Sequence, residues 1–200
     1  MDLLLGTNNV AKLEEMRAML SDLRITFHTL SEFKGVQPVP ETGNCYEENA
    51  LLKARSYAQQ TGLWVLADDS GLEVAALDGA PGVISARYAG AGASDSDRIA
   101  VLLSQIRRQG KNNAAARFVC ATALADASDS LVQVTSGSCE GQIIETSRGT
   151  NGFGYDPIFV PNGFNQTFAE LSADVKNLIS HRAKSLQAMH VFLEELLPGS

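Results

Sequence analysis

The spacing of apolar and polar residues predicts alternating strands and helices at the start of the chain. Residues 2–5 form a short apolar run typical of a buried strand, and apolar positions over residues 10–20 then follow helical spacing. Residues 24–30 alternate between apolar and polar side chains, which indicates a second strand. The chain is therefore expected to open as strand, turn, helix and strand.

A second helix and a third strand follow a loop rich in proline. Asn44 and Glu47 are spaced like a helix cap, and the helical pattern continues to about Thr61. Residues 64–67 are a compact apolar run that ends at the polar stretch 68–71, so we expect a strand with carboxylates at its carboxyl end. That edge is where open α/β sheets usually bind ligands.

The second half of the chain predicts a hairpin and a long terminal helix. A glycine-rich loop over residues 79–92 precedes a helix that begins at Ser94. Two strand-like runs, 116–125 and 131–138, are joined by a short polar segment. An amphipathic helix begins near Ser180. Strand and helix alternation with a hairpin predicts an α/β fold in which helices flank a mixed sheet.

Composition limits the class of protein. With 200 residues, 44% hydrophobic and 20% charged, the chain has an ordinary globular composition, and without repeats or linkers we expect a single domain over residues 1–200. A net charge of −7 argues against a nucleic-acid partner. No apolar run is long enough to cross a bilayer, and three cysteines lack zinc-site spacing. We therefore expect a cytoplasmic protein without a membrane partner.

The first turn combines groups that suit phosphate. Thr7, Asn8, Asn9 and Lys12 stand where the first predicted helix begins, and a helix N-terminus offers backbone N–H groups and a favourable dipole to an anion. The alternative is that an asparagine only caps the helix while Lys12 is solvated.

Carboxylates at the predicted strand end suggest a hard cation. Asp68 and Asp69, with Glu41, Glu47 and Glu48 in the preceding loop and helix as possible partners, offer the oxygen ligands that Mg²⁺ prefers. The alternative is that an Asp-Asp pair caps a turn.

Two further groups of side chains stand out, and the first of them suits recognition of a flat base. The glycine-rich loop at 149–157 carries Phe153 and Tyr155, and Asp156 beside them can accept a hydrogen bond; alternatively, the two rings complete the core. Donors also gather before the terminal helix. They are Lys176, Ser180, His181 and Arg182, and a Lys/His/Arg cluster at a helix N-terminus needs an anionic or acceptor partner, or solvent.

Together and in this order, these groups resemble the non-canonical purine NTP pyrophosphatases, the inosine/xanthosine triphosphate pyrophosphatase family. The matching stretches run from residue 7 to residue 182 and are Thr7-Asn8-Asn9-x-x-Lys12, Glu47-Glu48-Asn49-Ala50 with Lys53-Ala54, Ala67-Asp68-Asp69-Ser70-Gly71-Leu72, Pro81-Gly82 with Ser85-Ala86-Arg87-Tyr88, Gly152-Phe153-Gly154-Tyr155-Asp156-Pro157, and Ser180-His181-Arg182.

The resemblance implies two lobes around a central nucleotide-binding cleft, a homodimer and a Mg²⁺ cofactor. It also implies hydrolysis of inosine, deoxyinosine and xanthosine triphosphates to the monophosphate and pyrophosphate. A non-catalytic nucleotide sensor is the competing hypothesis, but a pure anion binder gains nothing from two aspartates beside phosphates.

The resemblance also implies roles for single residues. Asp69 is the expected catalytic base, and Ser70 is expected to contact substrate. The predicted metal ligands are Asp69, Glu41 and Asp68. The predicted triphosphate ligands are Thr7, Asn8, Asn9, Lys12 and Lys53. The predicted base-recognition residues are Phe153, Gly154, Tyr155, Asp156, Lys176, His181 and Arg182.

Overall fold

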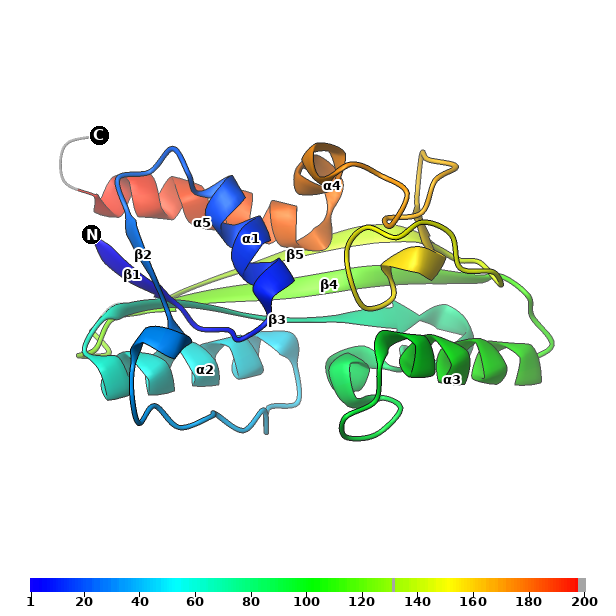
Figure 1. Cartoon of the computed structure of the whole chain (residues 1–200), viewed down its shortest axis with the longest axis horizontal. Helices are drawn as coiled ribbons and strands as arrows, with labels where there is room; N and C mark the ends of the chain where they lie inside the picture. Colours follow the sequence, from blue (N-terminus) through cyan, green and yellow to red (C-terminus); the bar gives the residue numbers. More distant parts are fainter. Residues whose placement is uncertain (131, 198–200) are drawn as a thin grey trace. The chain divides into compact units, whose positions relative to one another are not determined.

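The protein forms one mixed sheet with helices around it. The structure is a computed structural model that describes residues 1–130 and 132–197. Six strands are hydrogen-bonded in the order β2-β1-β3-β4-β5-β6 (Figure 1). Strand β1 pairs in parallel with β2 and β3, whereas β5 and β6 are antiparallel, which confirms the predicted mixed α/β sheet. The strands are β1 (Asp2–Leu5), β2 (Thr26–Thr29), β3 (Trp64–Val74), β4 (Ala114–Ala125), β5 (Val132–Ile143) and β6 (Phe159–Pro161).

Helices connect several of the strands and follow the last one, β6. Those that connect strands are α1 (Val10–Met19), α2 (Tyr46–Thr61) and α3 (Asp95–Arg108), and those that follow β6 are α4 (Ala173–Ile179) and α5 (His181–Leu196). Short 3₁₀ helices lie between these elements. Among residues 1–130 and 132–197, no helix is long and apolar enough to span a membrane.

The chain divides into two compact units. Unit 1 comprises Met1–Asp69, Cys120–Gly137 and Arg182–Ser200, and unit 2 comprises Ser70–Val119 and Ser138–His181. Strands β3, β4 and β5 therefore each contribute residues to both units. The predicted cleft between two lobes stays a prediction.

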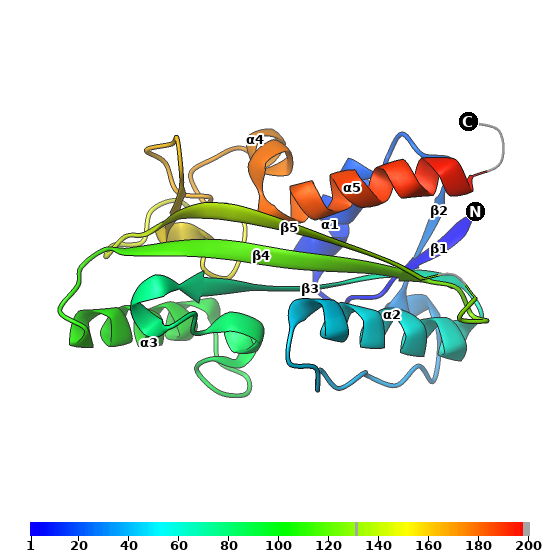
Figure 2. The ribbon, with the colours of Figure 1, turned by 180° about the vertical axis from the view of Figure 1, so that it is seen from behind.

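In unit 1, helices cover both faces of the sheet. Residues of α1 and α5 pack on one face in a single apolar cluster with Leu66 of β3. On the other face, a Cβ added at Gly6 would lie close to Val65 and Ala67 of β3 and to Tyr57 of α2. Figure 2 shows α2 on the opposite side of β3 from α1 and α5. Alternate residues of β3 therefore face different helices.

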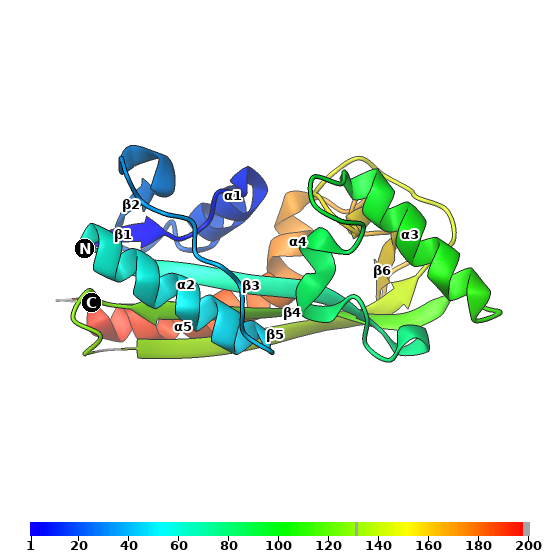
Figure 3. The same cartoon turned by 90° about the horizontal axis from the view of Figure 1, so that it is seen from below.

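Unit 2 has its own apolar core. Helix α3 contributes Ile99, Leu102 and Ile106, which pack with residues of β3, β4 and β5 (Figure 3). The helix begins as predicted, because Ser94 and Asp97 form a reciprocal capping box.

Several sequence predictions need correction. Strand β3 continues to Val74 instead of ending at Asp68, because both aspartates have buried partners. The predicted cap of α2 is wrong: its N-cap is Cys45, and the Asn44 backbone N–H donates to Glu48. Strand β5 extends five residues further than the predicted end at Ser138, and the predicted first residue Leu131 lies outside the described residues. Helix α4 and strand β6 were not predicted.

Candidate functional site

The adjacent aspartates of β3 lie on opposite faces of the sheet. Side chains alternate along a strand, so Asp69 shares the face of Val65 and Ala67, and Asp68 shares the face of Leu66. Their hydrogen-bond partners agree, because Asp69 contacts α2 whereas Asp68 contacts residues of α1 and α5. Each aspartate therefore belongs to a separate polar cluster within unit 1.

The Asp69 cluster is built on one face of α2. Asn49 and Lys53 are four residues apart, so they lie one above the other on the helix. Asn49 Nδ2 donates to Asp69 Oδ2 at 3.1 Å, and Lys53 Nζ donates to Asp69 Oδ1 at 3.2 Å. Lys53 Nζ also lies 2.9 Å from Glu41 Oε1. The Asp69 carboxylate is thus held through both oxygens.

The electrostatics of this cluster favour a basic carboxylate. Burial raises the pKa of Asp69; Lys53 opposes this shift, and the nearby Glu41 charge adds to it. Burial alone would lower the pKa of Lys53, but Asp68, Asp69 and Glu41 raise it overall. The result is a fixed ammonium beside a carboxylate that accepts a proton more readily than a solvated one.

The Asp68 cluster is a buried ion network. Asp68 Oδ2 lies 2.9 Å from Lys12 Nζ and accepts from Arg182 Nε at 3.2 Å and Nη2 at 3.0 Å. Arg182 Nη1 donates to Glu15 Oε2 at 2.5 Å. Burial opposes ionisation of Asp68, but Lys12 and Arg182 hold its pKa well below the usual range. The network thus pairs two basic side chains with two carboxylates.

The predicted phosphate turn leads directly into α1. Asn9 is the N-cap, and its Oδ1 accepts from the Lys12 backbone N–H at 3.2 Å. The Asn9 N–H in turn donates to Thr7 Oγ1 at 3.2 Å, and Asn8 is exposed. The capping alternative is correct for Asn9, but Lys12 is paired with Asp68 and is not simply solvated.

The predicted set of three metal carboxylates does not gather at one point. Within residues 1–130 and 132–197, no group of three or more His, Cys, Asp or Glu side chains is arranged to hold a metal ion. Asp68 is separated from Asp69 by the strand itself, since adjacent strand residues face opposite ways. Only Asp69 and Glu41 converge, on Lys53.

In unit 2, Asp156 organises the predicted base-recognition loop. Its Oδ2 accepts from Lys176 Nζ at 2.6 Å and from the Phe153 backbone N–H at 3.0 Å. Lys176 Nζ also lies 5.0 Å from the centre of the Phe153 ring, a cation–π distance. Gly152 has φ +73°, and a Cβ there would meet Asp156 Oδ2 at 2.0 Å, so only glycine fits. The loop is preformed around a buried ion pair.

Tyr155 differs from its neighbours in this loop. Its ring belongs to the unit 2 core, and its hydroxyl donates to the Ser85 carbonyl at 3.0 Å. This geometry favours the core-packing alternative for Tyr155. Phe153 and Gly154 are only half-buried, and the Gly154 N–H donates to Asp95 of α3 at 2.7 Å.

The donors predicted around the terminal helix are split between the units. His181 lies in unit 2, where its ring stacks on Phe118 with centroids 4.7 Å apart and planes 12° apart. Arg182 lies in unit 1 and is only 1% exposed. Ser70 is half-buried in β3. The sequence pattern grouped Arg182 with His181, whereas the Arg182 guanidinium contacts Asp68 and Glu15.

Three polar residues at these clusters were not predicted as site residues. They are Asn49 and Glu15 in unit 1 and Asp95 in unit 2. Asn49 could have been found, because it precedes Lys53 by one helical turn and shares its face. Its Oδ1 also accepts from the Gly43 backbone N–H at 2.7 Å, which links the Glu41 loop to Asp69.

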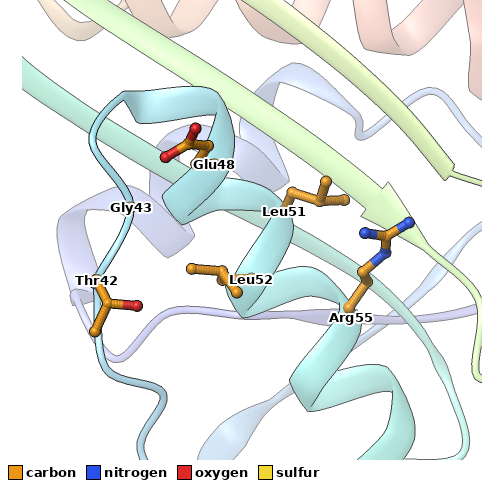
Figure 4. Close-up of a pocket in the computed structure, with 6 residues that line it drawn as sticks. All are labelled: Thr42, Gly43, Glu48, Leu51, Leu52 and Arg55. Carbon is orange, nitrogen blue, oxygen red and sulfur yellow. The ribbon is translucent and has the colours of Figure 1, made fainter.

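A pocket of about 340 Å³ opens on the outer side of α2 (Figure 4). Its lining residues are Thr42, Gly43, Glu48, Leu51, Leu52 and Arg55. None of the predicted site residues lines this pocket, so we give it no role in the chemistry.

Comparison with known proteins places the chain among nucleotide-handling enzymes. A protein of Coxiella burnetii named dITP/XTP pyrophosphatase is 44% identical over 196 residues, 98% of each chain. A relative of the same name from Exiguobacterium sp. is 44% identical over 199 residues, 100% of each chain.

Solved structures agree with the sequence relatives. A HAM1 protein from Coxiella burnetii superimposes with a TM-score of 0.89 at 44% identity, covering 98% of this chain and 99% of that one. The nucleoside-triphosphatase / dITP/XTP pyrophosphatase of Mycobacterium abscessus gives 0.71 at 37% identity, covering 99% and 98%. The profile of the Ham1 family matches residues 3–192. The chain therefore belongs to the Ham1 family.

Proposed function

We propose that this protein hydrolyses non-canonical purine nucleoside triphosphates, namely dITP, ITP and XTP, to the monophosphate and pyrophosphate. The relatives named dITP/XTP pyrophosphatase support this assignment. The observation that carries it is the Asp69 carboxylate, held by Asn49 and Lys53 beside Glu41. A buried carboxylate with a raised pKa is suited to general base catalysis.

Asp69 acts as the base. It orients a water molecule and accepts its proton as the oxygen attacks the α-phosphorus of the substrate. Asn49 and Lys53 fix both carboxylate oxygens, so the direction in which Asp69 accepts the proton is set before substrate binds. The bond from the α-phosphorus to the bridging oxygen breaks, and pyrophosphate leaves.

The N-terminus of α1 binds the triphosphate. Thr7, Asn8 and Asn9 present hydroxyl, amide and backbone donors there, and the helix dipole favours negative charge. The Lys12 and Lys53 ammonium groups offset the charge that develops on the departing pyrophosphate.

The Asp69 cluster fits a magnesium ion. Asp69 and Glu41 carry two negative charges against the single positive charge of Lys53, so these three groups leave one negative charge unbalanced. Magnesium is usually held by one or two protein carboxylates with waters and substrate phosphates. When bound to Asp69 and Glu41, it would offset phosphate charge. Asp68 fits this role poorly, because Lys12 and Arg182 already neutralise it.

The unit 2 cluster recognises the base. Phe153 offers a half-buried ring for stacking, held in place by Asp156 and Lys176. Donors near Ser180 and His181 pair with the O6 acceptor of a 6-oxo purine. Ser70 contacts the substrate from β3.

Residues 1–200 act as one catalytic domain. We also propose that the protein works as a homodimer in the cytoplasm, where the free nucleotide pool lies. Sedimentation of the purified protein tests the dimer directly.

The test of the proposed function is pyrophosphate release from dITP and XTP, with and without Mg²⁺. Glu41→Gln should raise the Mg²⁺ concentration needed for half-maximal rate, because it removes a ligand charge. Glu73→Gln, at an exposed pair with Arg117, serves as the control and should leave the Mg²⁺ requirement unchanged. Equal Mg²⁺ requirements in both variants would remove Glu41 from the metal site.

A further inference from the structure

In the Asp68 network only Lys12 has a role in the chemistry proposed above, yet burying the charges of Asp68 and Arg182 costs free energy. Asp68 and Arg182 are each 1% exposed, and Lys12 is the member of the network nearest to the proposed phosphate site. Desolvating two charges is expensive, and replacing a buried ion pair with apolar residues is often neutral or stabilising. A network of this kind therefore calls for an explanation other than stability.

We infer that Asp68 is a positioning residue: on the face of β3 opposite Asp69, it holds the Lys12 ammonium in place for the triphosphate, while Arg182 and Glu15 hold Asp68. The inference rests on the phosphate-binding role of Lys12 in the proposed function. It gives the adjacent aspartates different tasks, chemistry for Asp69 and placement of a cation for Asp68.

The ion pair between Lys12 and Asp68 fixes the lysine side chain. Lys12 occupies the first turn of α1, and Asp68 is its ion-pair partner at 2.9 Å. A lysine side chain has several rotatable bonds, so ordering it when the substrate binds costs conformational entropy unless the side chain is already held. The pair with Asp68 fixes the ammonium before the substrate arrives.

Arg182 keeps Asp68 in place. Two guanidinium nitrogens contact Asp68 Oδ2, and the third reaches Glu15 on α1, the helix that carries Lys12. Arg182 therefore ties α5, β3 and α1 together (Figure 1). We assign its side chain to this network instead of to the purine base. Arg182→Lys should therefore lower kcat/KM for dITP and dATP by the same factor.

A double-mutant cycle tests the coupling between Asp68 and Lys12. Lys12→Met should weaken binding of inorganic pyrophosphate by roughly 10- to 100-fold, the size of one lost charge-assisted hydrogen bond. Asp68→Asn should keep most of that affinity, because the ammonium remains, but should lower kcat by roughly tenfold through misplacement. The double variant should match the kcat of Lys12→Met within about twofold.

A matched control is Asp156→Asn, which also breaks a buried lysine–aspartate pair but lies in unit 2. Its effect on kcat should multiply with that of Lys12→Met. If the effects of Asp68→Asn and Lys12→Met also multiply, Asp68 acts independently of Lys12 and the inference is wrong. If Asp68→Asn does not fold, Glu15→Gln replaces it in the same cycle, because Glu15 lies at the more exposed edge of the network.

Acetylation of Lys12, followed by mass spectrometry, separates this inference from the proposed function. Asp68→Asn should speed acetylation of Lys12 relative to exposed Lys111 in the same chain, because the amine loses its partner. An unchanged ratio contradicts the pairing. Absence of pyrophosphate release by the parent protein would refute the proposed function, whereas the acetylation ratio would still decide the role of Asp68.

Discussion

At the scale of single residues, Asp69 is held from two sides by donors on one helix. Asn49 and Lys53 each occupy one of its oxygens, and burial together with Glu41 raises its pKa against the effect of Lys53. This environment differs from that of Asp68, whose pKa is lowered by two close cations. The pKa values of these two adjacent aspartates are thus shifted in opposite directions.

Asp69→Asn should lower kcat by roughly 10²–10⁴, the usual contribution of a positioned general base. Substrate binding should largely survive, because the amide keeps the shape and the lysines remain. Steady-state kinetics with dITP measure both quantities. Asp129→Asn, at an exposed pair with Arg55, is the control. Near-parental turnover in Asp69→Asn would exclude Asp69 as the base.

The roles of these residues could be predicted from sequence only in part. The motif placed Asp69, Lys53 and Glu41 in one site, and the structure brings them together. It could not show that Asp68 faces away, because that depends on the strand continuing through both aspartates. The partners that make this possible, Lys12 and Arg182, lie far away in sequence.

At the scale of elements, the start of α1 has a structural role as a helix cap and is the proposed phosphate-binding turn. The Asn9 side chain caps the helix through the Lys12 N–H, and the same turn presents donors to phosphate. A helix cap of this type contributes about 1 kcal/mol to stability. Under the proposed function, replacing Asn9 should therefore change both stability and substrate affinity.

Replacement of Asn9 should separate these effects. Asn9→Ala should lower the free energy of unfolding by about 1 kcal/mol, whereas Asn9→Ser should keep most of it because serine also caps. Both variants should raise KM for dITP, since both lose the amide. Urea unfolding and initial rates provide the measurements. If Asn9→Ser has the same KM for dITP as the parent protein, Asn9 caps the helix but does not bind the substrate.

The edge strand β2 has a pH-dependent contact with β1. His28 Nε2 lies 3.0 Å from Asp2 Oδ1, and Nδ1 lies 2.9 Å from Glu32 Oε2. Hydrogen bonds to Asp2 and Glu32 raise the pKa of His28 above its usual 6.5. A group whose pKa is raised by folding contributes its full stabilisation below the pKa that it has in the unfolded chain. This contribution is lost as the pH rises through its pKa in the folded protein.

The stability that depends on His28 should therefore be present at pH 5.5 and lost by pH 8.5. His28→Gln should remove this part of the pH dependence. Urea unfolding of parent and variant at both pH values tests it. An equal pH dependence in the two proteins would show that the contact contributes nothing, as many exposed ion pairs do.

Element prediction succeeded where periodicity was long and failed where partners were distant. Helical spacing after Ser180 predicts one apolar face made of Ala183, Leu186, Met189, Leu193 and Leu196. The first four are buried, and Leu196 near the helix end is half-buried. Strand β6 has three residues and α4 has seven, too short for a clear period. Their existence depends on pairing with β5 and on packing in unit 2.

At the scale of the whole molecule, the proposed residues fall into two groups. The residues proposed to bind phosphate and metal lie in unit 1, and the residues around Phe153 and Asp156 lie in unit 2. Composition and charge argue against a polyanion partner, but they could not divide the chain, because three strands run through both units. The assignment of these residues to one unit or the other follows from the contacts alone.

The two groups should determine different properties of the enzyme. Unit 1 residues should set the rate and the position of cleavage, and unit 2 residues should set the choice of base. A 6-oxo purine carries an acceptor at O6 and a donor at N1, whereas adenine reverses both. A pocket built for one pattern can reject the other by on the order of 10⁴. Guanine shares the 6-oxo pattern and should be rejected less strongly.

The most direct test is to identify and quantify the products formed from dITP and dATP with Mg²⁺ present. We predict equal amounts of monophosphate and pyrophosphate from dITP, and a kcat/KM for dITP higher than that for dATP by on the order of 10⁴. Release of orthophosphate with a diphosphate, or hydrolysis of dATP as efficient as that of dITP, would contradict the proposed function.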